Sequence, residues 1–307
     1  MKEFIADSFK YPKEVHFESS SRCNAKCITC PREGMTRQQG EMPNHLFVKG
    51  IDEMKEAKWE PELVHFHLNG EPLFLPIGEL CWRIKYAEQH LPKGTTFCLF
   101  TNASMLTPEV SERLLDSPLG FIVFSIDAGN KEAYARSRPG LDWDKMVCNI
   151  AEFMRIKVEK GSLIKTQTSF IPHIHNQDSL PDYYRLFNSL GILDVGGGGI
   201  VNIGGMVDAK KLRLGGQYTK GNIDAPCWRV FRDIDIMSDG RVCVCCQDVQ
   251  GKLVLGDLNK ETLPEIWQGE KFETVRKVHL SMNRESIPHC KDCDYMEGFV
   301  PDEWWPK

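Results

Sequence analysis

Hydrophobic positions along this chain follow two alternating periods, one typical of β-strands and one typical of α-helices. Short apolar runs predict strands, whereas segments with apolar residues three or four positions apart predict helices. We expect strands over residues 14–20, 63–70, 95–102, 120–127, 163–171 and 194–201. We expect helices over residues 45–57, 77–90, 108–115, 143–159 and 180–190, the third of them capped by Thr107. Six β/α units in series predict a parallel sheet with right-handed crossovers.

Polar residues inside the predicted strands distinguish an open flat sheet from a partial barrel. Three strands carry polar side chains on one shared face: Glu18 with Ser20, His65 with His67 and Asn69, and Ser125 with Asp127. A flat sheet covered on both faces would bury these groups away from water, whereas a barrel open at one end gives them water or a ligand. We therefore expect an α/β fold, a partial (β/α)6 TIM-like barrel, with its active site at the carboxyl ends of the strands.

The pattern changes near residue 207, after which no further β/α units follow. Residues 233–246 predict a β-hairpin turned at Ser238-Asp239-Gly240, because Asp-Gly favours tight turns. Residues 263–277 predict a short amphipathic helix. We therefore expect a barrel over residues 1–206 and a cysteine-rich extension over residues 207–307.

Composition narrows the class of protein. A hydrophobic content of 41% and a charged content of 26% over 307 residues are those of an ordinary globular protein. The net charge of −5 argues against a general nucleic-acid binder or a binder of anionic membranes. No apolar run approaches the roughly 18 residues of a membrane span, and residues 1–11 lack the apolar region of a signal peptide. We expect a cytoplasmic protein.

Twelve cysteines without an export signal indicate metal binding rather than disulfides. Cys23, Cys27 and Cys30 form a C-x3-C-x2-C triad directly after the first predicted strand. Three thiolates on one tight loop can hold three corners of an iron–sulfur cube and leave the fourth iron open for chemistry. The alternative is half of a zinc site, although zinc signatures more often come as paired C-x2-C units.

A second cysteine group lies in the C-terminal extension. Cys227, Cys245 and the Cys290-x2-Cys293 pair suit a closed four-cysteine site, and zinc is a competing occupant because such spacing also occurs in zinc ribbons. Cys246 can replace Cys245 in this set, and Cys243 fits a packed strand position. The three other cysteines fall inside apolar patterns and are expected in the core: Cys81, Cys98 and Cys148.

The N-terminal triad, in this position, resembles the radical S-adenosylmethionine (SAM) superfamily. Gly70-Glu71-Pro72 closes the second strand and is similar to the family's G-E-P motif, where backbone and carboxylate meet the methionine ammonium of SAM. Arg138 resembles a family arginine near the SAM carboxylate, a partner that a planar guanidinium suits. The segment 202–205 resembles a family segment near the SAM and substrate pocket.

Residues at the ends of the third, fourth and fifth strands extend this resemblance. They match places where the family hydrogen-bonds the SAM ribose and methionine carboxylate, with a further contact expected to the adenine from Thr168. The resemblance thus implies the following SAM contacts: Gly70, Glu71, Pro72, Thr101, Asn102, Ser125, Asp127, Arg138 and Thr168.

The C-terminal cysteines resemble the SPASM/twitch extension of radical SAM enzymes. Matching stretches are 239–242, 245–248 and 255–259, with Ile266-Trp267 in the helix before the last C-x2-C pair. No cysteine follows Cys293, so the chain departs from the full SPASM pattern and resembles the shortened twitch form. This form implies one auxiliary [4Fe–4S] cluster, fully ligated by Cys227, Cys245, Cys290 and Cys293.

The resemblance implies specific chemistry. The cluster at the triad would cleave SAM reductively to methionine and a 5′-deoxyadenosyl radical, which abstracts a substrate hydrogen. A closed auxiliary cluster suits an electron acceptor, and so a two-electron oxidation as in 2-deoxy-scyllo-inosamine dehydrogenase-like enzymes. An external electron donor such as flavodoxin or ferredoxin is implied. Polar lumen residues favour a small hydroxylated substrate, with no base singled out among them: Glu18, His65, His67, Asn69 and Gln167.

Two other functions stay open on the sequence. The first is a peptide-modifying enzyme of the same superfamily, although a chain that starts almost at the first strand is expected to lack a leader-peptide recognition domain. The second is a non-catalytic protein with zinc at the C-terminal cysteines and the barrel as a binding scaffold.

Overall fold

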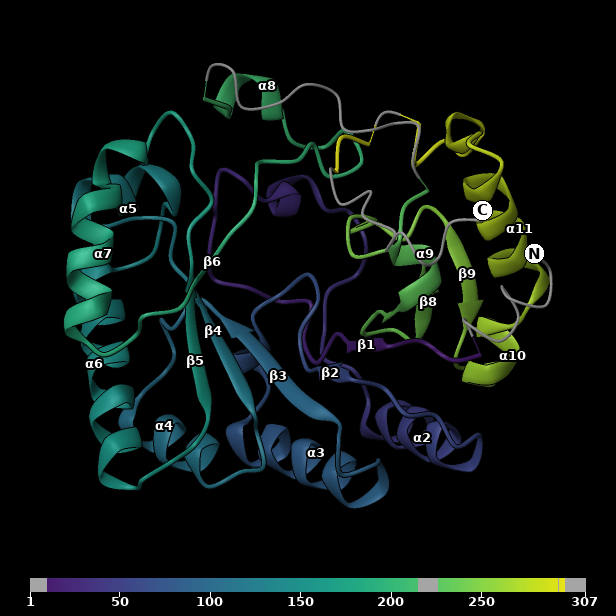
Figure 1. Ribbon diagram of the computed structural model, residues 1–307, viewed down its shortest axis with the longest axis horizontal. Coiled ribbons are helices and arrows are strands. Elements are labelled where there is room, and N and C mark those ends of the chain that lie inside the picture. The colour runs from purple at the N-terminus through teal and green to yellow at the C-terminus, as the bar shows by residue number, and fades with distance from the viewer. Residues whose placement is uncertain (1–9, 215–225, 292, 296–307) are drawn as a thin grey trace, which may run out of the picture.

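A curved sheet with helices along its outer side forms the framework of the molecule (Figure 1). The computed structural model describes residues 10–214, 226–291 and 293–295 of the chain. Nine strands run in the order β6-β5-β4-β3-β2-β1-β7-β8-β9. Their bounds are β1 Glu14–Phe17, β2 Leu63–His65, β3 Thr96–Thr101, β4 Phe121–Ser125, β5 Lys165–Ser169, β6 Val195–Gly196, β7 Asp233–Ile236, β8 Arg241–Cys243 and β9 Val254–Asp257.

Helices connect the strands of the barrel and flank the C-terminal hairpin. The α-helices of the barrel are α2 Asn44–Glu56, α3 Ile77–His90, α4 Pro108–Leu115, α5 Lys131–Ser137, α6 Trp143–Glu159 and α7 Leu180–Ser189. Those that follow are α8 Ala209–Leu212, α9 Arg229–Arg232, α10 Leu263–Trp267 and α11 Glu270–Leu280. Short 3-10 turns occur at η1 Pro31–Gly34, η2 Pro72–Phe74, η3 Gln177–Ser179 and η4 Arg284–Ser286. None of the described helices is long and apolar enough to cross a membrane.

The sheet confirms the parallel β/α arrangement and the partial-barrel class. Strands β1 to β6 pair in parallel, each with its neighbour in sequence. Strand β7 comes from the C-terminal extension, yet it pairs in parallel with β1 over four residues, and only β8 and β9 are antiparallel. The sheet therefore runs without interruption across the expected boundary at residue 206.

Capping residues explain why several predicted helices match the structure residue for residue. The Thr107 hydroxyl accepts a hydrogen bond from the Val110 backbone N–H at the start of α4, and Pro108 follows in the first helical position. The Asp142 carboxylate does the same for α6 by accepting from the Lys145 N–H. The hairpin turn is also confirmed, with Gly240 at φ +90° between β7 and β8.

The structure differs from the predicted elements in strand β6, in the helix expected over 263–277 and in elements that were not expected. Strand β6 keeps only two of the eight residues expected for it, since glycines 197–199 follow at once. The helix expected over 263–277 is two helices, because α10 ends before Gly269 and the Arg276 guanidinium donates to the Trp267 carbonyl at this end. Helix α5 and strand β9 were not expected.

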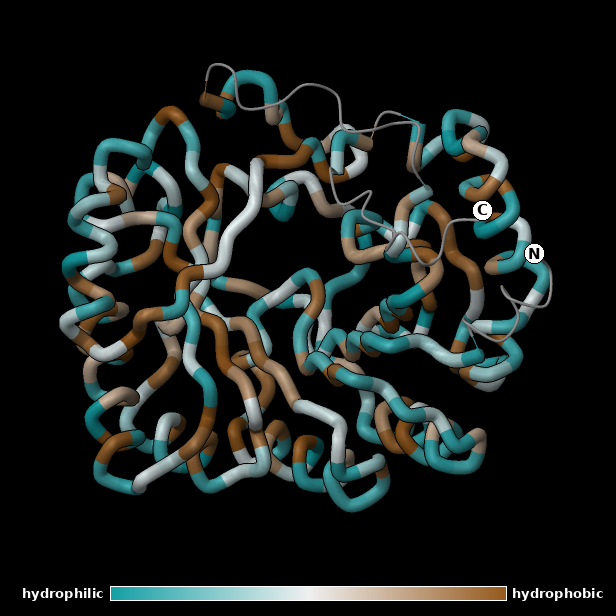
Figure 2. Tube along the Cα trace, viewed as in Figure 1, coloured by the Kyte–Doolittle hydropathy of each residue, from teal (hydrophilic) through white to brown (hydrophobic). Residues whose placement is uncertain are grey.

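Apolar side chains fill the space between the sheet and its helices. Hydrophobic positions concentrate along the central strands and the inner faces of the helices (Figure 2). On β1 the alternation is complete: Val15 and Phe17 are fully buried among the helices, whereas Glu14 and His16 face the barrel interior. The interior face is therefore polar, and the chemistry of the molecule lies there.

Candidate functional site: a cysteine-lined cavity at the carboxyl ends of the strands

A cavity of about 410 Å³ lies where the barrel strands end. Cys23, Cys27 and Cys30, on the loop after β1, all line it. Its volume is in the range of small-molecule sites. Seven of the nine residues expected at SAM line the cavity: Gly70, Glu71, Thr101, Asn102, Ser125, Asp127 and, from the end of α5, Arg138.

Gly70 and Glu71 join the end of β2 to the loop that carries the triad. A Cβ at Gly70 would lie 2.2 Å from the Ser20 carbonyl oxygen, so only glycine allows the two segments to approach. The Glu71 N–H donates to the Arg22 carbonyl at 2.7 Å. Position 70 therefore fixes where the cysteine loop stands relative to the sheet. Pro72 begins the turn η2 and is buried outside the lining.

The Glu71 carboxylate is held by the end of β3. It accepts hydrogen bonds from the Thr101 hydroxyl and the Asn102 N–H, both at 2.7 Å, and from the Leu73 N–H. Burial raises the pKa of Glu71, while these donors oppose the shift. Both oxygens thus have partners within the chain, and the carboxylate orients the end of β3 beside Cys23.

Arg138 and Asp127 form a buried ion pair beside the triad. The guanidinium donates to the Asp127 carboxylate at 2.6 Å and approaches the Cys27 sulfur at 3.4 Å. Asp127 has φ +58° and also accepts from the Ile171 N–H. Burial raises the pKa of the Cys27 thiol to about 12, and Arg138 opposes that shift. A fixed positive charge therefore faces the position that a thiolate and an anionic ligand would take.

His67 and Asn69 bring two further polar groups to the cavity wall. The Phe100 backbone N–H donates to Nδ1 of His67 at 3.2 Å, and the two rings stack at 4.2 Å. Burial lowers the pKa of His67 well below its usual value, so the ring is neutral and carries its proton on Nε2. The Asn69 amide nitrogen has no hydrogen-bond partner among the described residues.

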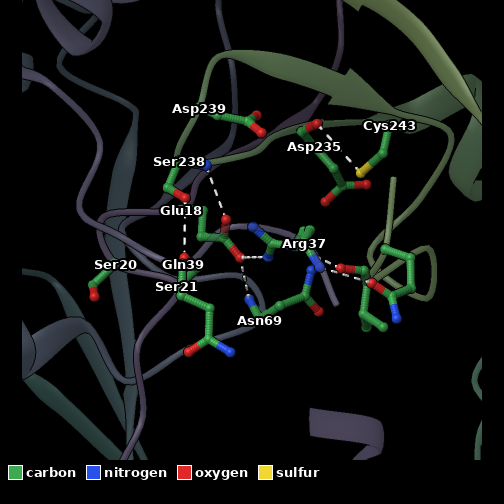
Figure 3. A network of polar contacts seen from close by, with 12 residues as sticks. Glu18, Ser20, Ser21, Arg37, Gln39, Asn69, Asp235, Ser238, Asp239 and Cys243 are labelled. Atoms are coloured by element: carbon green, nitrogen blue, oxygen red, sulfur yellow. Dashed lines mark hydrogen bonds and ion pairs between the residues drawn. The ribbon is translucent and has the colours of Figure 1, made fainter. Parts of the chain in front are cut away.

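Glu18 was expected to line the lumen, but other residues of the chain bind its carboxylate (Figure 3). It is fully buried, pairs with Arg37 at 2.5 Å, and accepts from the backbone N–H groups of Asn69 and Ser238. Glu18 is not among the residues that line the cavity. Its lone pairs are used within the chain, and it joins β1, β2 and β7 rather than serving a ligand.

Three other expected residues lie away from the cavity. His65 stands deeper in the barrel and stacks on His16 at 4.1 Å. The Gln167 amide lies against Gly196 of β6. Thr168, expected at the adenine, faces α7, because strand alternation turns it toward the buried Tyr183. The Thr168 side chain thus does not line the cavity, and the adenine contact expected from it stays a prediction.

The C-terminal cysteines surround a second, smaller cavity. Cys227, Cys245, Cys290 and Cys293 all line it. Cys246 lines the first cavity instead, which favours Cys245 as the fourth member of the set. Among the residues that the structure describes, no three of these sulfurs lie within 4.8 Å of one another. A single zinc ion holds its sulfurs about 3.8 Å apart, so this wider spacing favours a cluster.

The second cavity also suits a cationic occupant electrostatically. Burial raises the pKa of Cys227 to about 11 and that of Cys290 to about 12. Buried thiols with raised pKa values stay protonated at neutral pH, and a bound metal centre would supply the positive charge that stabilises their thiolates.

Gln247 forms the wall between the two cavities; the sequence placed it in the matching stretch 245–248 but gave it no role at the site. It lines both of them, and its side-chain Oε1 has no hydrogen-bond partner in the described part of the chain. Arg138 Nε, on the other side of the first cavity, is also without one. With the Asn69 amide, these atoms leave the cavity wall with free polar groups, as a site for a polar ligand requires. Ile203, in the expected 202–205 segment, lines the cavity too.

Comparison with known proteins shows which family this chain belongs to. The sequence profile of the radical SAM superfamily matches residues 17–187, and that of the SPASM iron–sulfur cluster-binding domain matches residues 227–294. The S-adenosyl-L-methionine-dependent 2-deoxy-scyllo-inosamine dehydrogenase of Niallia circulans is 22% identical over 91% of this chain and 92% of its own length.

Solved structures share the fold at low sequence identity. BtrN in complex with AdoMet and 2-DOIA is 17% identical with a TM-score of 0.63, over 95% of this chain and 99% of that chain. Streptococcus suis SuiB bound to the precursor peptide SuiA is 14% identical with a TM-score of 0.69, over 90% of this chain and 70% of that chain. The profile match covers more than half of the sequence, and the chain belongs to the radical SAM superfamily, with SAM and iron–sulfur clusters as its cofactors.

Proposed function

We propose that this radical SAM enzyme oxidises a small, polar, hydroxylated substrate by two electrons, converting a carbinol to a ketone. The observation that carries the proposal is the shared wall: Cys246 and Gln247 line the first cavity, while the adjoining Cys245 lines the second. A four-cysteine site with no open position therefore lies one residue from the cavity where the substrate would stand. Such a site suits electron acceptance rather than substrate binding.

We assign cofactor ligands from this arrangement. Cys23, Cys27 and Cys30 would hold the cluster that binds SAM, and Cys227, Cys245, Cys290 and Cys293 the auxiliary [4Fe–4S] cluster. When bound, these groups supply hydrogen-atom abstraction from a substrate carbon and acceptance of one electron. The proposed reaction also requires an external one-electron donor, such as a flavodoxin or ferredoxin.

Residues of the chain itself would bind SAM and hold the end of β3 and the cysteine loop in position. Arg138, fixed by Asp127, presents its guanidinium to the SAM carboxylate. Glu71 holds the end of β3 in place, so that Asn102 lies beside Cys23 and Asn24. Gly70 keeps the cysteine loop against β2. Because these contacts are preformed, little reorganisation is needed when SAM binds.

His67 and Asn69 are assigned to the substrate. With Nδ1 accepting from Phe100, His67 offers Nε2–H as a donor, and Asn69 offers its free amide N–H. Two neutral donors match the oxygen of a hydroxyl that becomes a carbonyl. In this tautomer His67 positions the oxygen and does not take the proton, so the base lies elsewhere.

The relatives support the same reading. The Niallia circulans protein is named a dehydrogenase of 2-deoxy-scyllo-inosamine, and it aligns with this chain over nearly its full length.

A peptide substrate is the second candidate, since SuiB with its bound precursor peptide has the same fold. SuiB extends beyond the aligned part, because the alignment covers 70% of that chain.

The test is coupled turnover in anaerobically reconstituted protein. SAM and a reductant are supplied with a panel of cyclitols and aminocyclitols, including 2-deoxy-scyllo-inosamine, and in parallel with model peptides. We expect one member of the cyclitol panel to lose two hydrogens in step with 5′-deoxyadenosine release. Coupled modification of a peptide, with only uncoupled SAM cleavage across the cyclitols, would contradict the proposal.

A further inference from the structure

A second group of chemically active side chains lies inside the barrel, away from both cysteine cavities. Glu14 and His16 come from β1 and His65 from β2, and one ligand atom of each lies within 4.8 Å of the others. The paired registers explain the grouping: His16 stands opposite His65 on one side and Asp235 on the other. Among the described residues, this is the only group of three such side chains that meets this distance.

The contacts within the cluster are close but leave polar atoms unused. His65 Nε2 lies 3.5 Å from a Glu14 oxygen, and the His16 and His65 rings stack at 4.1 Å. Apart from this approach of Nε2 to Glu14, the ring nitrogens of His65 have no partner among the described residues, although the side chain is only 7% exposed. A buried imidazole that lacks close hydrogen bonds is costly unless a ligand is bound to one of its nitrogens.

Asp235 on β7 completes the surroundings of His16. Its Oδ1 lies 2.9 Å from Nδ1 of His16, and the carboxylate is 1% exposed. This is the arrangement in which a carboxylate orients a metal-binding histidine and leaves Nε2 for the metal. Asp235 comes from the C-terminal extension, so the cluster spans both parts of the chain.

We propose that Glu14, His16 and His65 bind one divalent transition-metal ion, of which Zn²⁺ is the best match, with Asp235 orienting His16. Two imidazoles and one carboxylate form a ligand set that divalent zinc and iron accept. The set has no thiolate, which separates it chemically from both cysteine groups.

The charges around the cluster favour a cation. Three carboxylates lie together here, those of Glu14, Asp233 and Asp235. Arg229 pairs with Asp233 at 2.7 Å, and Arg232 pairs with Glu14 at 2.9 Å. Asp235 pairs with His16 and has no arginine or lysine partner among the ion pairs of the described chain, so a bound cation would take the place of a proton on His16 in offsetting its negative charge.

The position indicates a structural role. The ligands join β1 to β2, and the orienting aspartate joins β7 to β1, so one ion would link the barrel and the extension at their shared edge. His67, which lines the SAM cavity, lies one layer above, with its ring centroid 5.2 Å from that of His65. The ion would lie outside the residues that line that cavity.

The experiment measures bound metal in the holoenzyme. Protein reconstituted anaerobically with iron and sulfide is equilibrated with Zn²⁺, passed through a desalting column, and analysed for zinc, iron and sulfide per chain. Zinc-edge X-ray absorption then reports the ligands. We expect about one zinc per chain with nitrogen and oxygen neighbours at about 2.0–2.1 Å and no sulfur at about 2.3 Å.

Variants separate this site from the cysteine sites. His65→Gln and Glu14→Gln should each reduce bound zinc at least tenfold while iron and sulfide stay unchanged. His173→Gln, which changes a fully buried histidine elsewhere in the chain, should keep the zinc. The proposal is overturned if wild-type holoenzyme binds no stoichiometric zinc, if the zinc has sulfur neighbours, or if both variants retain it. The wild-type result decides even where a variant does not fold.

Discussion

Arg138 contributes two contacts that no other described residue duplicates: the ion pair with Asp127 and the 3.4 Å approach to the Cys27 sulfur. We expect Arg138→Gln to weaken SAM binding at least tenfold, about 1.4 kcal/mol, because the guanidinium fork is lost and Asp127 stays buried without its partner. Isothermal titration of SAM into the reconstituted protein measures the change.

Arg136→Gln is the matched control for that variant. Arg136 is on the same helix and pairs with Asp178, but its side chain is 43% exposed. An exposed pair contributes little, so SAM affinity should stay within about twofold of wild type. If Arg138→Gln lowered the melting temperature and left SAM affinity intact, Arg138 would be structural only.

The buried His173 makes the free energy of unfolding depend on pH. Burial lowers its pKa to about 4, below the ordinary value of 6.5. A lowered folded-state pKa means that this histidine favours the folded state above pH 6.5 and loses that contribution as pH falls toward 4. The loss amounts to about 2 kcal/mol between pH 7 and pH 5. We expect His173→Gln to show a smaller drop in unfolding free energy over that range, measured by urea titration at each pH.

The sequence predicted which residues belong to the site better than it predicted where each side chain lies. The cysteine triad, Gly70 and Glu71 of the G-E-P motif, Asp127 and Arg138 all line one cavity, as the resemblance implied. Thr168 does not line the cavity because the alternation of β5 turns it toward α7, and Gln167 does not line it because its amide lies against Gly196 of β6. Glu18 was misplaced because its partners Arg37 and Ser238 come from distant segments.

At the scale of elements, the position of the cysteine loop after β1 depends on its close packing against the end of β2. Gly70→Ala would place a Cβ 2.2 Å from the Ser20 carbonyl, and the backbone on one side must move. We expect this variant to lose the triad's cluster and keep the auxiliary one, so that iron falls from about eight to about four per chain. Iron and sulfide analysis after anaerobic reconstitution checks this.

Gly94→Ala is the control, since a Cβ there meets no atom within 4 Å. It should retain the full iron content. Unchanged iron and normal SAM cleavage in Gly70→Ala would show that the loop does not need this close approach.

Local signals explain which elements were predicted well. Helices α3, α4 and α6 match residue for residue, and α4 and α6 begin at a capping side chain. The break between α10 and α11 was missed because it depends on Arg276 reaching back to Trp267, a contact between residues nine positions apart. The pairing of β7 with β1 was missed for the same reason, since more than two hundred residues separate the two strands.

At the scale of the whole molecule, that pairing makes the extension part of the barrel. Ile234 and Ile236 of β7 and Trp267 of α10 are fully buried, and the Leu263 N–H donates to Glu53 of α2. We expect a chain ending at residue 206 to lack a cooperative thermal transition, because it exposes the β1 edge and this core. A sharp melt and native near-ultraviolet circular dichroism in the truncated chain would show that residues 1–206 fold alone.

The measurement that tests the proposed oxidation most directly is isotope transfer from the substrate. Holoenzyme, SAM and reductant are incubated with an aminocyclitol carrying deuterium at its carbinol carbon, and both products are analysed by mass spectrometry. We expect one deuterium in 5′-deoxyadenosine and a ketone that has lost it. A ketone formed while 5′-deoxyadenosine stays free of deuterium, or deuterium transfer only from a labelled peptide, would contradict it.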